Sequence, residues 1–225
     1  MRMTVIEHEA GAGLGYLADW LGLPCDVVRP YLGEPVPERA ADGLIVLGGE
    51  AAAWEDDDHP WLPATRDLLR ASVEQGVPTL GICLGAQLLT LACGGTVERG
   101  AAGLEVGACA VTALPAAEHD VLFHGIGTAV AIQYHRDAMT RLPEGAVPLL
   151  TGTQYPNQGY RLGDSAWAVQ FHPEATPAIF ASWTAASGVQ GLDEAVAAAE
   201  PGLIAAWRPV AERFAALVKT RATVG

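Results

Sequence analysis

Cys83 is the residue of this chain whose neighbours most favour chemistry. It stands in the segment 81–85, Gly-Ile-Cys-Leu-Gly, directly after the apolar run 77–80 and before a helical pattern. A nucleophile at a sharp strand-to-helix turn needs small neighbours, because larger side chains would crowd it. The N-terminus of the following helix also favours a thiolate over a thiol. The pattern therefore predicts a nucleophilic cysteine, although a buried core cysteine is the commoner situation.

A thiolate nucleophile benefits from a base, and two of the six histidines are candidates. His172 and Glu174 end an apolar strand pattern two residues apart, so both side chains point the same way and the carboxylate can orient the imidazole. His135 with Asp137 is a rival pair, weaker because nothing marks where its strand stops. An isolated His-x-Glu is more often a surface feature, but with Cys83 in the chain we predict His172 as the base.

Two further features suit an acyl-transfer site. Gly48 and Gly49 follow the apolar run 43–47 and offer backbone N–H groups that can stabilise an oxyanion. Loops at the carboxyl ends of strands in an open α/β sheet commonly bind ligands. Gln87 lies one helical turn after Cys83 and can reach a polar group of a substrate. The alternative for Gly48 and Gly49 is an ordinary strand-to-loop turn, and the alternative for Gln87 is a solvated helix residue.

Composition excludes several classes of function. Lys and Arg number 13 against 26 Asp and Glu, and the formal net charge of −13 opposes binding to nucleic acid. No apolar stretch approaches the roughly 18 residues of a membrane helix. The first ten residues lack the apolar segment of a signal peptide, so a cytoplasmic location is expected. The four cysteines show no metal-ligand spacing, so we expect neither a metal site nor a disulfide framework.

Three other segments are discounted as cofactor or ion sites. The glycines of residues 11–15, "GAGLG", lack the third glycine of a dinucleotide fingerprint, so this segment is predicted to be a mobile loop. The acidic run 55–58 is predicted to be solvated and to cap the next helix. No phosphate-binding loop motif is present, and no cofactor is expected.

The elements that must position these residues alternate between strands and helices. Apolar runs at 3–7, 43–49 and 77–83 separated by helical patterns favour parallel strands with helices on both faces. One helix is predicted from Pro60, with Asp58 as its N-cap. After residue 95 the pattern changes to β segments, which predicts antiparallel additions to the sheet. A closing helix is predicted from about Leu203, kinked or restarted at Pro209. We expect one domain over 1–225, with a helical extension from about 188.

The motifs, taken together, resemble those of the class I (triad) glutamine amidotransferases. "GICLGAQLL" resembles the nucleophile motif of that family, "VLGGE" its oxyanion strand and "VQFHPE" its His-Glu motif. The stretch "PWLPATRDLLRASVEQGVPTLGICLGAQLL" is similar to stand-alone members related to the glutaminase domain of GMP synthase. The resemblance runs from about residue 40 to residue 185.

The resemblance implies a flavodoxin-like three-layer fold and a defined chemistry. Cys83 would attack the side-chain amide of glutamine, and His172, held by Glu174, would protonate the leaving ammonia and then activate water. The backbone at Gly49 and Leu84 would form the oxyanion hole. Gly48, Gln87, His135, Arg136 and Asp137 would contact the substrate. A synthetase supplied separately would receive the ammonia in a coupled reaction.

One departure from the family pattern leaves the substrate open. Relatives often carry His-Gly-Asp or Ser-His-Gly where this chain has His135-Arg136-Asp137. Asp137 can pair with an α-ammonium group, and Arg136 can bind a carboxylate or face solvent. A γ-glutamyl amide or peptide is therefore an alternative substrate.

Two alternatives of other classes also remain at this point. An α/β-hydrolase similar to the dienelactone hydrolases would use Cys83, Asp137 and His172, although the position of Glu174 argues against it. A catalytically silent binding or regulatory module is the other, since fold alone does not guarantee activity.

Overall fold

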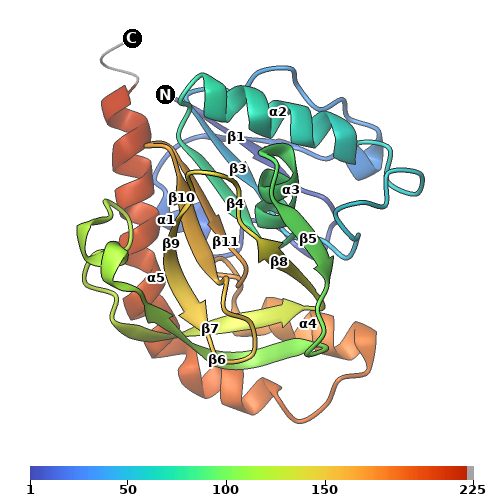
Figure 1. The fold of residues 1–225 in the computed structure, drawn as a ribbon. Helices are drawn as coiled ribbons and strands as arrows, with labels where there is room; N and C mark the ends of the chain where they lie inside the picture. Colours follow the sequence, from blue (N-terminus) through green and yellow to red (C-terminus); the bar gives the residue numbers. More distant parts are fainter. Residues whose placement is uncertain (222–225) are drawn as a thin grey trace.

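A nine-stranded sheet forms the centre of the computed structural model, which describes residues 1–221 (Figure 1). Its order is β2-β1-β3-β4-β11-β10-β9-β6-β7. The first five strands in this order pair in parallel. They are β2 (Cys25–Val28), β1 (Met3–Ile6), β3 (Gly43–Val46), β4 (Thr79–Ile82) and β11 (Ala166–Val169).

The remaining strands of the sheet are antiparallel additions, as predicted. They are β10 (Gly159–Leu162), β9 (Val147–Gly152), β6 (Glu105–Ala113) and β7 (Thr128–His135). Two short strands, β5 (Thr96–Arg99) and β8 (Asp137–Arg141), pair with each other outside the main sheet. The 3₁₀ segments are η1 (Pro30–Leu32) and η2 (Pro115–His119).

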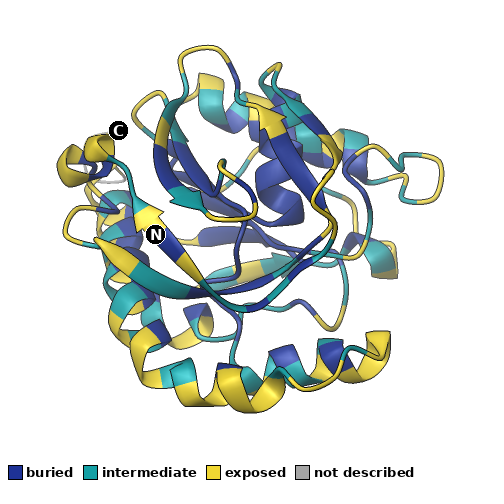
Figure 2. Cartoon of the chain, turned by 60° about the horizontal axis from the view of Figure 1, so that its bottom comes forward, coloured by how far each residue is buried: buried dark blue, intermediate teal, exposed yellow. Residues whose placement is uncertain are grey.

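Helices cover both faces of the sheet, so the α/β three-layer prediction is confirmed. One face carries α2 (Leu62–Glu74) and α3 (Leu84–Ala92), whose apolar side chains belong to one core cluster. The other face carries α1 (Leu17–Trp20), α4 (Pro177–Ser187) and α5 (Asp193–Arg221), which contribute to a second cluster. Every residue of β1, β3, β4 and β11 is buried, as a strand covered on both sides requires. Figure 2 shows these strands dark blue between helices with exposed outer surfaces.

Two helix predictions were wrong in detail. The helix expected from Pro60 begins at Leu62, with Trp61 at the N-cap position. No side chain caps this helix, so the prediction of Asp58 as its N-cap is wrong. The closing helix begins at Asp193, earlier than expected, and it is not restarted at Pro209, because one helix is continuous over Asp193–Arg221.

The apolar stripe of α5 accounts for the continuous helix. The buried side chains of α5 are Val196, Leu203, Trp207, Val210, Ala211, Phe214, Ala215 and Val218. Burying a large apolar side chain stabilises by roughly 1.5–3 kcal/mol, and several of these together outweigh the roughly 3 kcal/mol that each of the two interior prolines, Pro201 and Pro209, costs.

The C-terminal part of the chain packs on the body of the protein. The long helix α5 contacts β6, β7, α1 and α4. A single domain over 1–225 stays a prediction, and its last four residues lie outside the described part. Between residues 1 and 221, none of the helices has the length and apolarity that crossing a bilayer requires.

Candidate active site

Cys83 occupies the turn between β4 and α3. Its φ of 50° and ψ of −106° make it the one non-glycine residue with positive φ in the described range 1–221. The two glycines have separate steric reasons. A Cβ on Gly81 would lie 2.7 Å from the carbonyl oxygen of Gly85, and a Cβ on Gly85 would lie 2.0 Å from that of Val46. The turn therefore requires both glycines, and it places the thiol at the carboxyl edge of the parallel strands.

His172 and Glu174 follow β11 at the same edge. The N–H of His172 donates to the carbonyl of Ile132 at 2.8 Å, which fixes the backbone. Its Nδ1 lies 2.7 Å from Glu174 Oε1, and both side chains are buried. Burial disfavours the imidazolium, but the charges and hydrogen bonds of Glu174 and Cys83 outweigh it and raise the pKa of His172 well above its ordinary value.

The structure brings Cys83 and His172 together across Gly48. A Cβ on Gly48 would lie 2.8 Å from His172 Cε1 and 3.5 Å from Cys83 Cβ, so the two side chains flank this glycine. Both line one cavity of about 310 Å³, at the lower end of the range typical of small-molecule sites. Sulfur and imidazole therefore face one ligand-sized space.

Gly49 and Leu84 lie side by side next to the thiol. A Cβ on Gly49 would lie 3.1 Å from Leu84 Cδ2, and Gly49 lines the cavity. Within the described chain, neither amide N–H donates a hydrogen bond to a protein group. An oxyanion hole requires N–H groups that no protein acceptor uses, so these two are its candidate donors.

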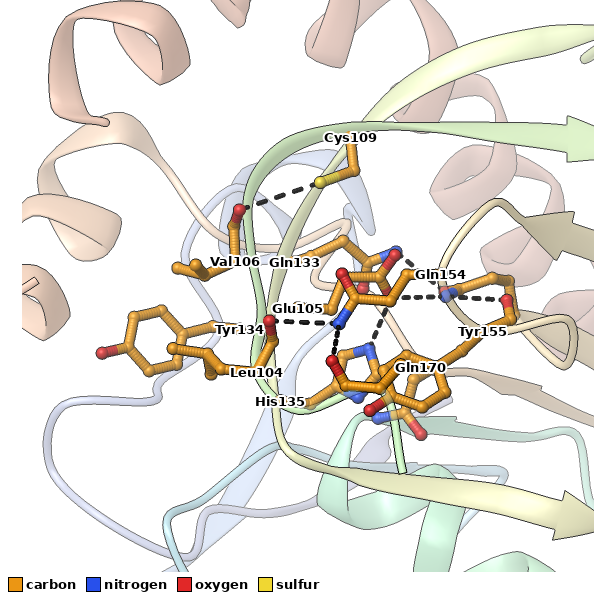
Figure 3. Close-up of polar contacts among 12 residues, drawn as sticks. Leu104, Glu105, Val106, Cys109, Gln133, Tyr134, His135, Gln154, Tyr155 and Gln170 are labelled. Atoms are coloured by element: carbon orange, nitrogen blue, oxygen red, sulfur yellow. Dashed lines mark hydrogen bonds and ion pairs between the residues drawn. The ribbon is translucent and has the colours of Figure 1, made fainter. Parts of the chain in front are cut away.

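His135 is not paired with the side chain of Asp137, so the alternative prediction of His135 as a base oriented by the Asp137 carboxylate is wrong. Its Nδ1 donates to the backbone carbonyl of Asp137 at 2.9 Å, and its Nε2 lies 2.8 Å from Glu105 Oε2. Gln158 donates to the same carboxylate at 2.8 Å and accepts from Gln133 at 2.8 Å. Figure 3 shows this buried network around His135 and Glu105. Both ring nitrogens face acceptors, so His135 holds the chain rather than removing a proton.

Asp137 also does not serve as the acid partner of His172. Its carboxylate lies 2.9 Å from Arg99 Nε, whereas His172 is bonded to Glu174. Burial raises the pKa of Asp137, and Arg99 acts against that rise. The arrangement of Cys83, Asp137 and His172 expected for a dienelactone-type hydrolase is therefore absent from the described residues.

Two further predicted contacts, Gln87 and Arg136, line the same cavity. Arg136 is exposed at its edge, and Gln87 lies within it. The Gln87 amide donates to the carbonyl of Asp137 at 3.2 Å and to Gln170 Oε1 at 3.4 Å. Gln170 Nε2 in turn lies 3.8 Å from Cys83 Sγ. Gln87 therefore ties α3 to the segment that carries Arg136.

The segment 11–15, predicted to be a mobile loop, contacts the neighbours of His172. Trp183 of α4 lies against the His172 ring with centroids 4.7 Å apart, and its Nε1 donates to the carbonyl of Gly11 at 2.8 Å. A Cβ on Gly15 would lie 2.0 Å from the carbonyl oxygen of Glu174. Its position in the loop that follows β1 was the signal available in the sequence, because such loops line sites in α/β sheets.

The acidic run 55–58 has structural roles that the sequence did not suggest. Glu55 lines the cavity and accepts from the N–H of Ala52 at 2.8 Å. Asp56 binds Arg66 through both carboxylate oxygens at 2.9 and 2.6 Å. Among residues 1–221, no group of three or more His, Cys, Asp or Glu is arranged to hold a metal ion.

Comparisons with known proteins agree on one family. A family model described as "Glutamine amidotransferase class-I" matches residues 20–184. GMP synthase (glutamine-hydrolysing) of Wolinella succinogenes is 34% identical over 159 residues, which cover 68% of this chain and 29% of that protein. Gamma-glutamyl peptidase 5 of Arabidopsis thaliana is 31% identical over 136 residues, covering 59% of this chain and 53% of that protein.

A solved structure shows the same fold over nearly the whole chain. A glutamine amidotransferase from Thermotoga maritima superposes with a TM-score of 0.84 at 26% sequence identity, and the match covers 96% of this chain and 98% of that one. The present chain therefore spans less than a third of the GMP synthase that it resembles and almost all of the amidotransferase structure.

Proposed function

The chain belongs to the class I glutamine amidotransferase family, and on that premise we propose that it hydrolyses the side-chain amide of glutamine through a thioester on Cys83. One observation carries the proposal. Cys83 and His172, which is bonded to Glu174, flank Gly48 beside a single cavity and lie next to the unused N–H groups of Gly49 and Leu84.

In the first half of the reaction, the thiolate of Cys83 attacks the carbonyl carbon of the amide. The carbonyl oxygen becomes an oxyanion, which the N–H groups of Gly49 and Leu84 stabilise. His172, as the imidazolium, donates a proton to the amide nitrogen. The C–N bond then breaks, ammonia leaves and the γ-glutamyl thioester remains.

In the second half, His172 is neutral and acts as the base. It accepts a proton from water, the hydroxide attacks the thioester carbon, and the same two N–H groups stabilise the second oxyanion. The C–S bond breaks, glutamate leaves, and the thiolate and imidazolium are restored. Glu174 holds the imidazole in one orientation during both steps.

The cavity residues Arg136 and Asp137 would contact the amino-acid end of the substrate. Arg136 is exposed at the cavity edge and makes no ion pair within residues 1–221, so it is available to a carboxylate. Asp137 lines the cavity and, although it is paired with Arg99, can also accept from an ammonium group. Gln87 and His135 hold this segment by their bonds to the carbonyl of Asp137. Gly48 leaves the space between the thiol and the imidazole open.

A second candidate is hydrolysis of γ-glutamyl peptides by the same residues. The similarity to a gamma-glutamyl peptidase supports it, and so does the free guanidinium of Arg136 at the cavity edge, which can bind a peptide carboxylate. Transfer of ammonia to a synthetase is a further proposal, supported by the similarity to GMP synthases.

The test is release of glutamate and ammonia by the purified protein from glutamine and from γ-glutamyl dipeptides. We expect Cys83→Ala to abolish release, and we expect mass spectrometry of acid-quenched wild-type protein to find a γ-glutamyl adduct on Cys83. Release from dipeptides alone would select the second candidate. Release that survives in Cys83→Ala, or no release from any substrate, would refute the mechanism and favour a silent module.

A further inference from the structure

The end of β1 and the residues just after it hold the loop of Gly48 and Gly49 from both sides. On the strand side, the N–H of Leu47 donates to the carbonyl of Ile6 at 3.0 Å. On the other side, the N–H of Glu50 donates to Glu9 Oε2 at 3.0 Å. Gly48 and Gly49 therefore lie between two hydrogen bonds whose acceptors belong to one short stretch, residues 6–9.

The same stretch packs directly under Gly49. A Cβ on Gly49 would lie 3.0 Å from His8 Cβ, so the glycine rests on this side chain. The indole of Trp61 donates to His8 Nδ1 at 3.0 Å, and burial lowers the pKa of His8 to about 3. His8 is therefore a neutral, fixed support for the backbone above it.

Glu9 is the polar part of this support. It lines the cavity beside Gly49 and lies close enough to His172 for their charges to interact. Burial raises the pKa of Glu9, and the hydrogen bond from the N–H of Glu50 acts in the opposite direction. The carboxylate is thus partly withdrawn from solvent. It accepts a hydrogen bond from the backbone N–H of Glu50, a residue 41 positions later in the sequence.

We propose that Glu9 is a positioning residue that fixes the Gly49–Glu50 peptide so that the N–H of Gly49 stays directed at the reacting carbonyl. Two consecutive glycines have the greatest backbone freedom of any pair, so the loop does not hold a single orientation by itself. An oxyanion hole is effective only when its donors are in place before charge develops. The inference rests on the proposed function, because it assigns Gly49 as an oxyanion donor.

Three variants separate the hydrogen bond from the charge. Glu9→Ala removes the acceptor, and we expect kcat to fall about 10- to 100-fold with KM changed less than about threefold, because the lost bond acts on the transition state. Glu9→Gln keeps an acceptor oxygen without charge and should restore kcat to within about fivefold of the wild type. Glu50→Ala removes a neighbouring carboxylate of the cavity but keeps the backbone N–H, so it is the matched control for charge.

A second measurement reports on the oxyanion hole itself. Glutamate γ-semialdehyde adds the thiol of Cys83 to its aldehyde carbon, and the aldehyde oxygen becomes the oxyanion of a hemithioacetal. The inhibition constant of glutamate γ-semialdehyde should therefore rise in Glu9→Ala by about the same factor by which kcat falls. Glutamine binding to the Cys83→Ala protein, measured by calorimetry, should change less than about threefold when Glu9→Ala is added.

The outcomes distinguish the inference from the function on which it rests. A Glu9→Ala protein that is folded by circular dichroism and keeps both kcat and semialdehyde affinity overturns the inference and leaves the proposed function intact. Equal losses in Glu9→Ala, Glu9→Gln and Glu50→Ala would assign the effect to cavity charge and also overturn it. A wild-type protein without Cys83-dependent turnover would refute the proposed function instead.

Discussion

Removing the carboxylate of Glu174 is the sharpest test of the proposed base. Its Oε1 lies 2.7 Å from His172 Nδ1, and both side chains are buried. Glu174→Ala leaves the Nδ1–H group without this acceptor, and a hydrogen bond to a charged group contributes about 1.5–3 kcal/mol. If that bond supports the transition state of acylation, kcat/KM for ammonia release should fall by roughly 10- to 150-fold.

The titration of His172 should change in the same variant. Burial disfavours the imidazolium and Glu174 favours it, so Glu174→Ala should lower the pKa of His172. A raised pKa in the folded protein stabilises the fold at pH values below the ordinary pKa of imidazole, and this contribution is lost as the pH rises through the folded-state pKa. The difference in free energy of unfolding between the wild type and Glu174→Ala should therefore become smaller as the pH rises into the alkaline range. NMR titration of His172 and urea unfolding at several pH values measure both effects.

Asp137→Asn is the matched control for the loss of a carboxylate. Asp137 faces Arg99 and not His172, so we expect a higher KM while the burst of thioester formation remains. Rapid-quench measurement of the burst compares the two variants directly. A burst that disappears in Asp137→Asn and survives in Glu174→Ala would refute the assignment of the acid and support the arrangement of Cys83, Asp137 and His172.

Three further predictions concern the geometry around the thiol. Gly48→Ala should lower kcat by about 100-fold, because its Cβ would lie 2.8 Å from His172 Cε1; wild-type kcat would contradict this. Cys83→Gly should be more stable than Cys83→Ala by about 1 kcal/mol in urea unfolding, because glycine relieves the strained φ of 50° at some entropic cost; equal midpoints would argue against strain. Glu105→Ala should destabilise the protein by about 1–3 kcal/mol, because it removes the acceptor that lies 2.8 Å from His135 Nε2 and leaves a buried ring nitrogen without a partner; an unchanged free energy of unfolding in chemical denaturation would exclude that role.

The sequence was sufficient to predict the candidate site residues that short local motifs identify. Cys83 stands between two glycines that the turn requires, and His172 and Glu174 end a buried strand, so short-range rules locate all three. The order of strands and helices follows from the same alternation of apolar runs. The three-layer fold was therefore accessible without coordinates.

Hydrogen-bond partners that depend on which strands pair could not be predicted from local sequence patterns. His135 is bonded to Glu105 because β7 and β6 pair in a register that places these residues opposite each other, and nothing local to either residue indicates it. Glu9 reaches Glu50 for a similar reason, since β1 and β3 are neighbours in the sheet. The continuity of α5 through Pro209 depends on the surface that it covers and not on its own composition.

The place of β11 in the sheet has a consequence for how the protein matures during synthesis. This strand is the last one within residues 1–221, yet it lies between β4 and β10 in the middle of the sheet. While the ribosome is still making it, β4 has an unpaired edge directly before the thiol, and such an edge can recruit foreign strands. Until β11 docks, the nascent chain therefore has an edge open to aggregation, and the docking that covers this edge also brings His172 to the proposed site.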